Sequence, residues 1–106
     1  MKNINEFVYR IFKKNEFDDF IRNLVFKGNV IDKNSGFIHM STKNQIKGTL
    51  NLYFKEEKEI YIVKFRVSNL GNLLKWEKSR NNDLFPHYYG TLKSRLIIKK
   101  LQKNHI

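Results

Sequence analysis

The sequence contains no cysteine and only one proline among its 106 residues. Without cysteine, disulfide bonds cannot support the fold and thiolates cannot bind zinc, which suits a reducing compartment. No stretch comes near the roughly 20 consecutive apolar residues of a membrane-spanning helix, and no apolar signal core follows the first six residues. We therefore expect a cytoplasmic protein that has no membrane partner.

Acidic residues are scarce, with 10 Asp and Glu against 21 Lys and Arg, so that the net charge is +11. No acidic residue follows Asp83, which leaves a basic C-terminal end that carries Lys93, Arg95, Lys99, Lys100 and Lys103. A basic surface attracts phosphates, nucleic acid or anionic lipid. The lysines also occur in every segment beside many Asn and Ile residues, as in proteins of AT-rich genomes, so a solvated surface explains them equally well.

Aromatic residues are abundant, with nine Phe, five Tyr and one Trp. Each buries on the order of 150–250 Å² in a folded protein, so these residues can fill a real core. Domains commonly run to about 100–150 residues. We therefore predict one domain over residues 1–106.

Local patterns predict a mixture of strands and helices. A capping box at Thr42 and Gln45 opens one helix, which directs Ile46, Leu50 and Tyr53 inward. An earlier helix is capped by Asn15 and stops at Gly28, with Phe17 and Phe20 on its apolar face. Strands are predicted over residues 7–12, 36–40, 60–67, 73–77 and 96–98, turns over 32–36 and 55–59, and a polar loop over 78–83. The pattern indicates an α+β fold, with two helices against a mostly antiparallel sheet.

His39 and Ser41 are two residues apart at the end of a predicted strand. Residues with this spacing lie on one face of a strand. The helix that starts after Thr42 has free N–H groups at its beginning, and such groups favour a phosphate or carboxylate. In the alternative interpretation, Ser41 only helps to cap the helix and His39 is a partly buried structural residue.

The segment Phe85-Pro86-His87-Tyr88-Tyr89-Gly90 is the densest group of unusual residues. His87 and Tyr89 share a face if the segment is extended, and Pro86 predicts a strand start or an edge strand. Gly90 allows a tight turn or the close approach of a ligand. The alternative is an aromatic corner in which Phe85 and Tyr88 pack inward, and both can hold together because alternate residues face opposite ways.

Two further charged residues are candidates for the site. Glu77, next to Trp76, is a candidate general base or a residue that orients a histidine. Because Lys75 and Lys78 flank it, a solvated ion pair is the simpler explanation. Arg10, in the middle of the first predicted strand, is a candidate anchor for an anion or an outward-facing strand residue.

These motifs resemble the small bacterial family catalogued as domain of unknown function 952, which is placed by fold among the ADP-ribosyltransferase-like proteins. The resemblance covers nearly the whole chain and lies in Gly36 to Thr42, Gln45, Trp76-Glu77, Leu84 to Gly90 and Leu92. It implies a split, mostly antiparallel β-structure that holds a nicotinamide dinucleotide such as NAD in a central cleft. Two departures are clear: Arg10 stands where family members usually carry His, and the Glu of the last catalytic strand has no match except Glu77.

The resemblance implies a set of roles for the candidate residues. The catalytic candidates are His39, His87, Tyr89 and Glu77, and the candidates that contact a cofactor are Arg10, Ser41, Thr42, Trp76 and Gly90. The partner would be an anionic, nucleotide-like small molecule. The protein would then be an ADP-ribosyltransferase-like glycosyltransferase or a domain that binds NAD or ADP-ribose.

Other functions stay open at this point. His39-x-Ser41 matches one half of a two-histidine phosphoesterase, but His87-x-Tyr89 does not match the other half. The spacing of His39, His87 and Glu77 fits no known metal-ligand pattern. The charge also permits a basic nucleic-acid- or protein-binding module without catalysis, although no recognition motif is present. A structural domain with a vestigial cleft is the last alternative, and the oligomeric state is not indicated.

Overall fold

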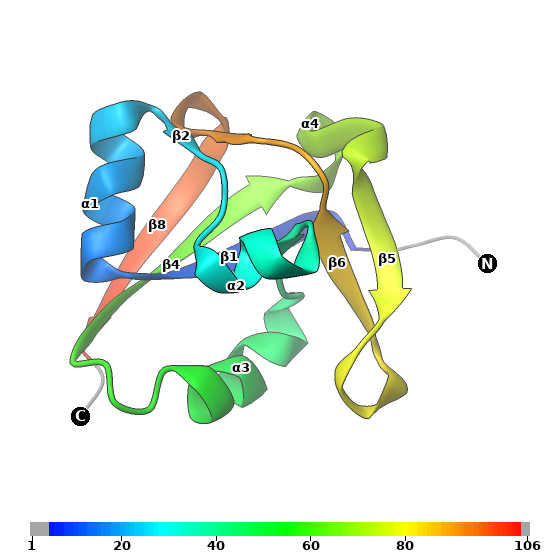
Figure 1. The fold of residues 1–106 in the computed structure, drawn as a ribbon, viewed down its shortest axis with the longest axis horizontal. Coiled ribbons are helices and arrows are strands. Elements are labelled where there is room, and N and C mark those ends of the chain that lie inside the picture. Colours follow the sequence, from blue (N-terminus) through cyan, green and yellow to red (C-terminus); the bar gives the residue numbers. More distant parts are fainter. Residues whose placement is uncertain (1–4, 105–106) are drawn as a thin grey trace.

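The computed structural model describes residues 5–104, which form an α+β fold of antiparallel sheets and short helices (Figure 1). The strands are β1 (Phe7–Lys13), β2 (Val25–Phe26), β3 (Ile38–His39), β4 (Glu59–Arg66), β5 (Leu74–Lys78), β6 (Leu84–Tyr88), β7 (Leu92–Lys93) and β8 (Ile97–Asn104). The helices are α1 (Lys14–Asn23), α2 (Val30–Ser35), α3 (Ile46–Tyr53) and α4 (Val67–Leu70), with 3₁₀ turns at Lys43–Gln45, Gly71–Leu73, Arg80–Asn82 and Ser94–Leu96. Within residues 5–104, no helix has both the length and the apolar character needed to cross a membrane.

Two three-stranded sheets carry the fold, in the orders β1-β4-β8 and β3-β6-β5, and β2 pairs with β7. Every named strand pair is antiparallel. The two larger sheets meet where the backbones of Tyr9 and Ser41 exchange two hydrogen bonds of 2.8 Å. The prediction of an α+β fold with antiparallel strands is confirmed, but residues 5–104 contain four α-helices where two were predicted. The bridge also sets the end of β3 beside the middle of β1.

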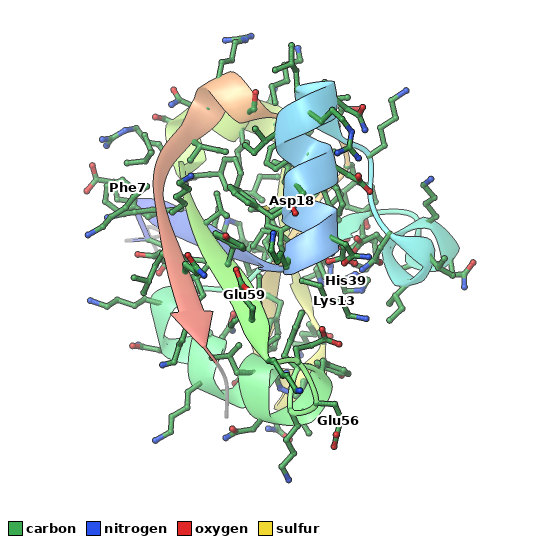
Figure 2. The ribbon with its side chains drawn as sticks, turned by 90° about the vertical axis from the view of Figure 1, so that its left-hand side faces the viewer. Phe7, Lys13, Asp18, His39, Glu56 and Glu59 are labelled. Atoms are coloured by element: carbon green, nitrogen blue, oxygen red, sulfur yellow. The ribbon has the colours of Figure 1, made fainter. Side chains whose placement is uncertain are left out.

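The main core is aromatic and lies between α1 and the sheets. Phe12, Phe17, Phe20 and Phe26 contact one another in it, and Phe17 stacks on Tyr61 of β4 with ring centroids 4.4 Å apart. Figure 2 shows α1 and β8 facing the viewer, with Phe7 beyond β8 on the left and His39 to the right of the lower end of α1. Because side chains alternate along a strand, the other face of β1 directs Ile11 into a smaller cluster, where it packs with Leu50 of α3 and Ile60 of β4.

The first helix differs from its prediction at both ends. It begins at Lys14, so Asn15 lies inside it, and the side chain of Glu16 accepts the N–H of Lys13 at 3.1 Å. It ends at Asn23 because Leu24 takes a left-handed conformation, with φ 68°. Gly28 is therefore not its stop.

In the segment 32–36, predicted as a turn, residues 32–35 belong to α2. Asn29 caps this helix by accepting the N–H of Asp32 at 3.0 Å, and Gly36 ends it with φ 89°. Asn, Ser and Gly are turn formers as well as cap residues, which explains the error. In α3, Ile46 and Leu50 pack inward as predicted, but Tyr53 is 64% exposed, so its predicted inward position is wrong.

The prediction that Pro86 starts a strand or lies in an edge strand is also wrong, because Pro86 is in the middle of β6 and β6 lies between β3 and β5. The carbonyl of Pro86 accepts the N–H of Met40 at 3.1 Å. The backbone N and O atoms of one strand residue point toward the same neighbouring strand. The nitrogen of Pro86, which has no hydrogen to donate, therefore also faces Met40, the residue that follows β3. A central strand tolerates this proline because the neighbouring strand stops there.

Candidate functional site

A cleft of about 190 Å³ lies among β1, β3, β6, α2 and α3. Its polar lining includes four of the predicted site residues, which come from three different strands or strand ends. They are Arg10, His39, Ser41 and His87. Five polar residues that were not predicted as site residues also line the cleft, namely Asn29, Asp32, Thr49, Ser79 and Arg80. The apolar lining includes Ile31, Tyr53, Phe54 and Phe85.

Asp32, on α2, is the polar centre of the site and is only 2% exposed. Its Oδ1 accepts the Arg10 Nη1–H at 2.9 Å and the backbone N–H of His39 at 3.0 Å. The same oxygen lies 2.8 Å from Nδ1 of the His39 ring. Its other oxygen, Oδ2, accepts the backbone N–H of Asn29 at 2.8 Å. One carboxylate thus joins β1, α2 and β3.

The surroundings of Asp32 keep it ionised. Burial alone raises the pKa of this carboxyl, because a charged group loses hydration. The hydrogen bond from His39, and then the charge and hydrogen bond of Arg10, outweigh burial and hold the pKa of Asp32 well below its usual 3.8. An ionised carboxylate can accept hydrogen bonds but cannot donate them. Nδ1 of His39 must therefore be the ring nitrogen that carries the proton.

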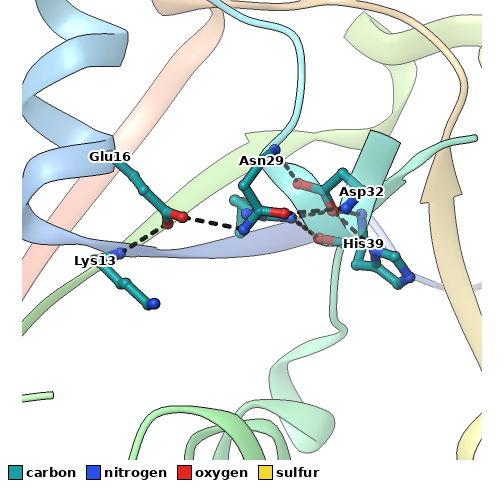
Figure 3. Close-up of polar contacts among 6 residues, drawn as sticks. Lys13, Glu16, Asn29, Asp32 and His39 are labelled. Atoms are coloured by element: carbon teal, nitrogen blue, oxygen red, sulfur yellow. Dashed lines mark hydrogen bonds and ion pairs between the residues drawn. The ribbon is translucent and has the colours of Figure 1, made fainter. Parts of the chain in front are cut away.

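A chain of polar contacts holds Asp32 in place (Figure 3). The side chain of Glu16 accepts from Lys13 N–H and, at 3.0 Å, from the amide of Asn29. Asn29 in turn forms a capping box with Asp32. Gly28 is required beside this network, since its φ is 107° and a Cβ there would lie 2.8 Å from the Cβ of Asp32. The start of α1 is thereby connected to His39.

Arg10 does not face outward, and its guanidinium is paired within the protein. It lies on the same face of β1 as Val8 and Phe12, is 5% exposed, and passes over the ring of Phe26 with 4.9 Å to the centroid. Its Nη1 donates to Asp32 and to the backbone carbonyl of His39, each at 2.9 Å. The positive charge expected to grip a phosphate is therefore neutralised by a buried carboxylate.

His87 on β6 is held in the same manner as His39. Its Nδ1 lies 2.7 Å from Oε1 of Glu77 on β5, and its ring stacks on Phe37 with centroids 3.9 Å apart. The same Glu77 oxygen accepts the hydroxyl of Tyr89 at 2.8 Å. These hydrogen bonds, from His87 first and then Tyr89, lower the pKa of Glu77. Glu77 is not among the residues that line the cleft, so its geometry fits orientation of His87 and not direct work as a base.

The two histidines face each other across the β3–β6 pair. His39 and His87 are direct partners in the register, and their ring centroids are 5.8 Å apart. Side chains that are directly opposite in an antiparallel pair lie on the same face of the sheet. Within residues 5–104, neither ring makes a hydrogen bond through Nε2. With each Nδ1 bound to a carboxylate, Nε2 is the nitrogen of each ring that can exchange a proton with a ligand.

The lining of the cleft also carries two hydroxyls and a second arginine. The hydroxyls of Ser41 and Thr49 lie 3.3 Å apart, and Ser41 is 4% exposed. Arg80, in the turn between β5 and β6, donates from Nη2 to the Thr49 hydroxyl at 3.3 Å. The segment 78–83 was predicted only as a polar loop. Nothing in its local pattern indicates that Arg80 reaches the cleft, because the contact is made with a helix 31 residues away.

Four other predicted site residues lie outside the cleft lining. Thr42 serves the predicted capping box, in which its N–H donates to Gln45 Oε1 at 3.0 Å. Trp76 packs against the main core, and Tyr89 is 41% exposed. A Cβ at Gly90 would lie 2.8 Å from the ring of Tyr88, so the close approach at Gly90 is made by a side chain of the same protein.

These features define an α+β protein whose cleft contains two histidines, each bound to a carboxylate. Residues 11–100 match the family model described as protein of unknown function DUF952, and the chain belongs to this family. It is similar to protein CC0527 from Caulobacter crescentus, whose crystal structure is 29% identical over 91% of this chain and 84% of that chain, with a TM-score of 0.87. The solution structure of the same protein gives 29% identity, 90% and 82% coverage, and a TM-score of 0.80. No curated protein is significantly similar to the chain.

Proposed function

We propose that the cleft binds an anionic, nucleotide-like small molecule and that His39 and His87 exchange protons with it. One observation carries this proposal: two histidines are paired in register, and each has Nδ1 bound to a carboxylate and Nε2 unbonded within residues 5–104. A single carboxylate-bound histidine is common as a structural feature. Two that line one cleft match the requirement of reactions in which one group takes a proton while another gives one.

In this proposal, some residues contact the ligand and others hold those contacting residues in position. His39 and His87 are the proton-transfer groups, and Ser41 contributes a hydroxyl to the same lining. Asp32 and Glu77 are positioning residues, which set the ring orientation and the protonated nitrogen of each imidazole. Phe37 stacks on His87 and restricts the rotation of its ring.

An ADP-ribosyltransferase-like fold and NAD as the ligand stay part of this proposal, on the strength of the family resemblance. A transferase of this class needs a carboxylate near the sugar carbon that becomes positive. Glu77 is not in the cleft lining, and Asp32, which is, already accepts four hydrogen bonds. The geometry therefore supports acid–base chemistry by the histidines better than glutamate-assisted transfer.

The size of the cleft restricts how much of a ligand it can enclose. Small-molecule pockets usually measure about 300–1,000 Å³. At about 190 Å³, this cleft is smaller, so it would enclose one end of a dinucleotide and leave the other end at the surface. The exposed side chains of Ile31 and Tyr53, which also line the cleft, would cover the outer part of such a ligand.

Calorimetric titration of the protein with ADP-ribose and with NAD tests the proposal. We expect saturable binding that is at least about tenfold weaker in His39→Ala, since the loss of a hydrogen bond to a charged group costs about 1.5–3 kcal/mol. His39→Ala is the informative variant because the side chain is 39% exposed, so its removal should leave the fold intact. Thr91→Ala, outside the cleft lining, is the control. Absence of binding, or equal affinity in His39→Ala, would reject the proposal.

The basic nucleic-acid- or protein-binding module is a second candidate because of one surface feature. Strand β8 forms an edge of its sheet and carries exposed Lys99, Lys100 and Lys103. Binding of single-stranded nucleic acid through such lysines would weaken steeply with salt. The affinity for nucleic acid should also be unchanged in His39→Ala, whereas the affinity for a ligand in the cleft should fall.

A further inference from the structure

We propose that Arg80, and not Arg10, is the residue of the cleft that binds the negatively charged group of the ligand. This inference rests on the proposed function of the cleft as a site for an anionic molecule. It assigns the charge recognition to a turn between β5 and β6 that carries no sequence motif. Two arginines line the cleft, and their surroundings differ.

Arg10 is the weaker candidate because Asp32 already balances the charge of its guanidinium, although Nη2 makes no hydrogen bond among the described residues. Its Nη1 already donates to Asp32 Oδ1 and to the carbonyl of His39. Its Nε has no hydrogen-bond partner among the described residues, but this atom is closed to solvent. An anion at Arg10 would also meet the ionised carboxylate of Asp32, which repels it.

Arg80 differs from Arg10 in that its charge is not paired with a carboxylate among the described residues. It lines the cleft and is half-buried, and within residues 5–104 no carboxylate lies within ion-pair distance of it. A cation at the wall of a partly enclosed cleft attracts an anion more strongly than a fully hydrated cation does, because water screens it less. Arg80 is thus the cleft arginine whose charge is not already balanced by a neighbouring carboxylate.

The guanidinium of Arg80 is also held in a defined place. It lies over the ring of Phe85, 4.8 Å from the centroid, and donates from Nη2 to the hydroxyl of Thr49. A Cβ at Gly48 would come within 3.2 Å of Nη2, so the glycine lets α3 approach the guanidinium closely. An arginine that is ordered before binding loses less conformational entropy when a ligand arrives.

The contacts of Arg80 also relate it to the histidines. Thr49, which accepts from Arg80, lies 3.3 Å from the hydroxyl of Ser41, and Ser41 follows His39 by two residues. The planar fork of a guanidinium matches the paired oxygens of a phosphate or a carboxylate. The ligand group recognised here is therefore a phosphate or carboxylate within the cleft that contains both imidazoles.

The test compares Arg80→Met with Arg95→Met, an exposed arginine outside the cleft lining. Calorimetry with ADP-ribose, inorganic pyrophosphate, malonate and uncharged adenosine separates phosphate from carboxylate recognition and both from recognition of the base. We expect Arg80→Met to weaken binding of the favoured anion about 10- to 100-fold, with adenosine unchanged and Arg95→Met like wild type. Arg80→Lys should be intermediate, because it keeps the charge and loses the fork.

The outcomes separate this inference from the proposed function. If wild-type protein and Arg80→Met bind ADP-ribose or another of these anions equally, Arg80 is not the anchor, while the cleft can still be the site. If wild-type protein binds none of the three anions, both proposals are wrong. Thermal unfolding of Arg80→Met, expected within a few degrees of wild type, shows whether a loss of binding reflects a loss of fold.

Discussion

Replacement of Asp32 by alanine is expected to lower the free energy of unfolding by about 3–5 kcal/mol, because it removes one partner of a buried ion pair. The side chains of Arg10 and Asp32 are 6% and 2% exposed, and their charged atoms are 2.9 Å apart. Without Asp32, the Arg10 guanidinium keeps its charge but loses its counterion, and the backbone N–H of His39 loses its acceptor. Chemical denaturation monitored by the fluorescence of Trp76 measures the effect.

The matched control is Asp18→Ala, which breaks an ion pair of similar length at the surface. Asp18 and Lys14 are 2.8 Å apart on α1 but are about half exposed, so the expected loss is below about 0.5 kcal/mol. A loss for Asp32→Ala no larger than that of Asp18→Ala would contradict the role given to Asp32. Asp32→Asn, which keeps the shape and one acceptor oxygen, should fall between the two.

The same carboxylate predicts how stability depends on pH. The pKa of Asp32 is lowered in the folded protein, so below its usual 3.8 the unfolded chain binds a proton that the folded protein does not. The contribution of Asp32 is therefore fully present above about pH 5 and is lost as the pH falls toward the folded pKa. In Asp32→Asn, the free energy of unfolding should decline less steeply between pH 5 and pH 3.

The second large effect is expected on the rate of the reaction in the cleft when His87 is replaced by glutamine. General acid–base groups contribute about 100- to 10,000-fold to a rate. On the proposed function with NAD as the ligand, we expect a loss of this size in the hydrolysis of NAD, in which water replaces nicotinamide on the ribose carbon and a proton is released. Nicotinamide release measured by chromatography gives the rate. Because His87 is 5% exposed, thermal unfolding must show that the variant is folded under the assay conditions.

Two further variants distinguish a catalytic His87 from a structural one. Glu77→Gln removes the carboxylate bound to Nδ1 and should lower the reaction rate, because the orientation and the protonated nitrogen of the His87 ring are no longer fixed. Tyr89→Phe removes only the second hydrogen bond to Glu77, so its effect should be small. A His87→Gln variant that is folded and retains the rate of wild type within about threefold would show that the imidazole does no proton transfer.

Much of the fold could be predicted because its signals are local. The alternation of residues 60–67 predicted the strand that became β4, and Thr42 with Gln45 predicted the start of the segment that leads into α3. His39, Ser41 and His87 were found because unusual residues stand at strand ends, where side chains of one strand face alternate directions. These predictions need no knowledge of which segments meet in space.

The missed residues belong to contacts between distant segments. Asp32 was read as part of a turn, although the spacing of Asn29 and Asp32 is that of a capping box and could have indicated a helix there. Its contacts with Arg10 and His39 depend on how β1, α2 and β3 pack, which no local pattern encodes. Arg80 is a still clearer case, because only the packing of its turn against α3 brings it into the cleft.

The central claim is that two imidazoles are fixed with Nδ1 protonated and Nε2 available to an anionic ligand. Long-range ¹H–¹⁵N NMR spectra of the histidine side chains test it directly, because they report which ring nitrogen carries the proton. In the neutral state, both His39 and His87 should show the Nδ1–H tautomer, and ADP-ribose should shift both Nε2 resonances in a saturable manner. The Nε2–H tautomer in either ring, or Nε2 resonances that do not respond to ADP-ribose, would contradict the account.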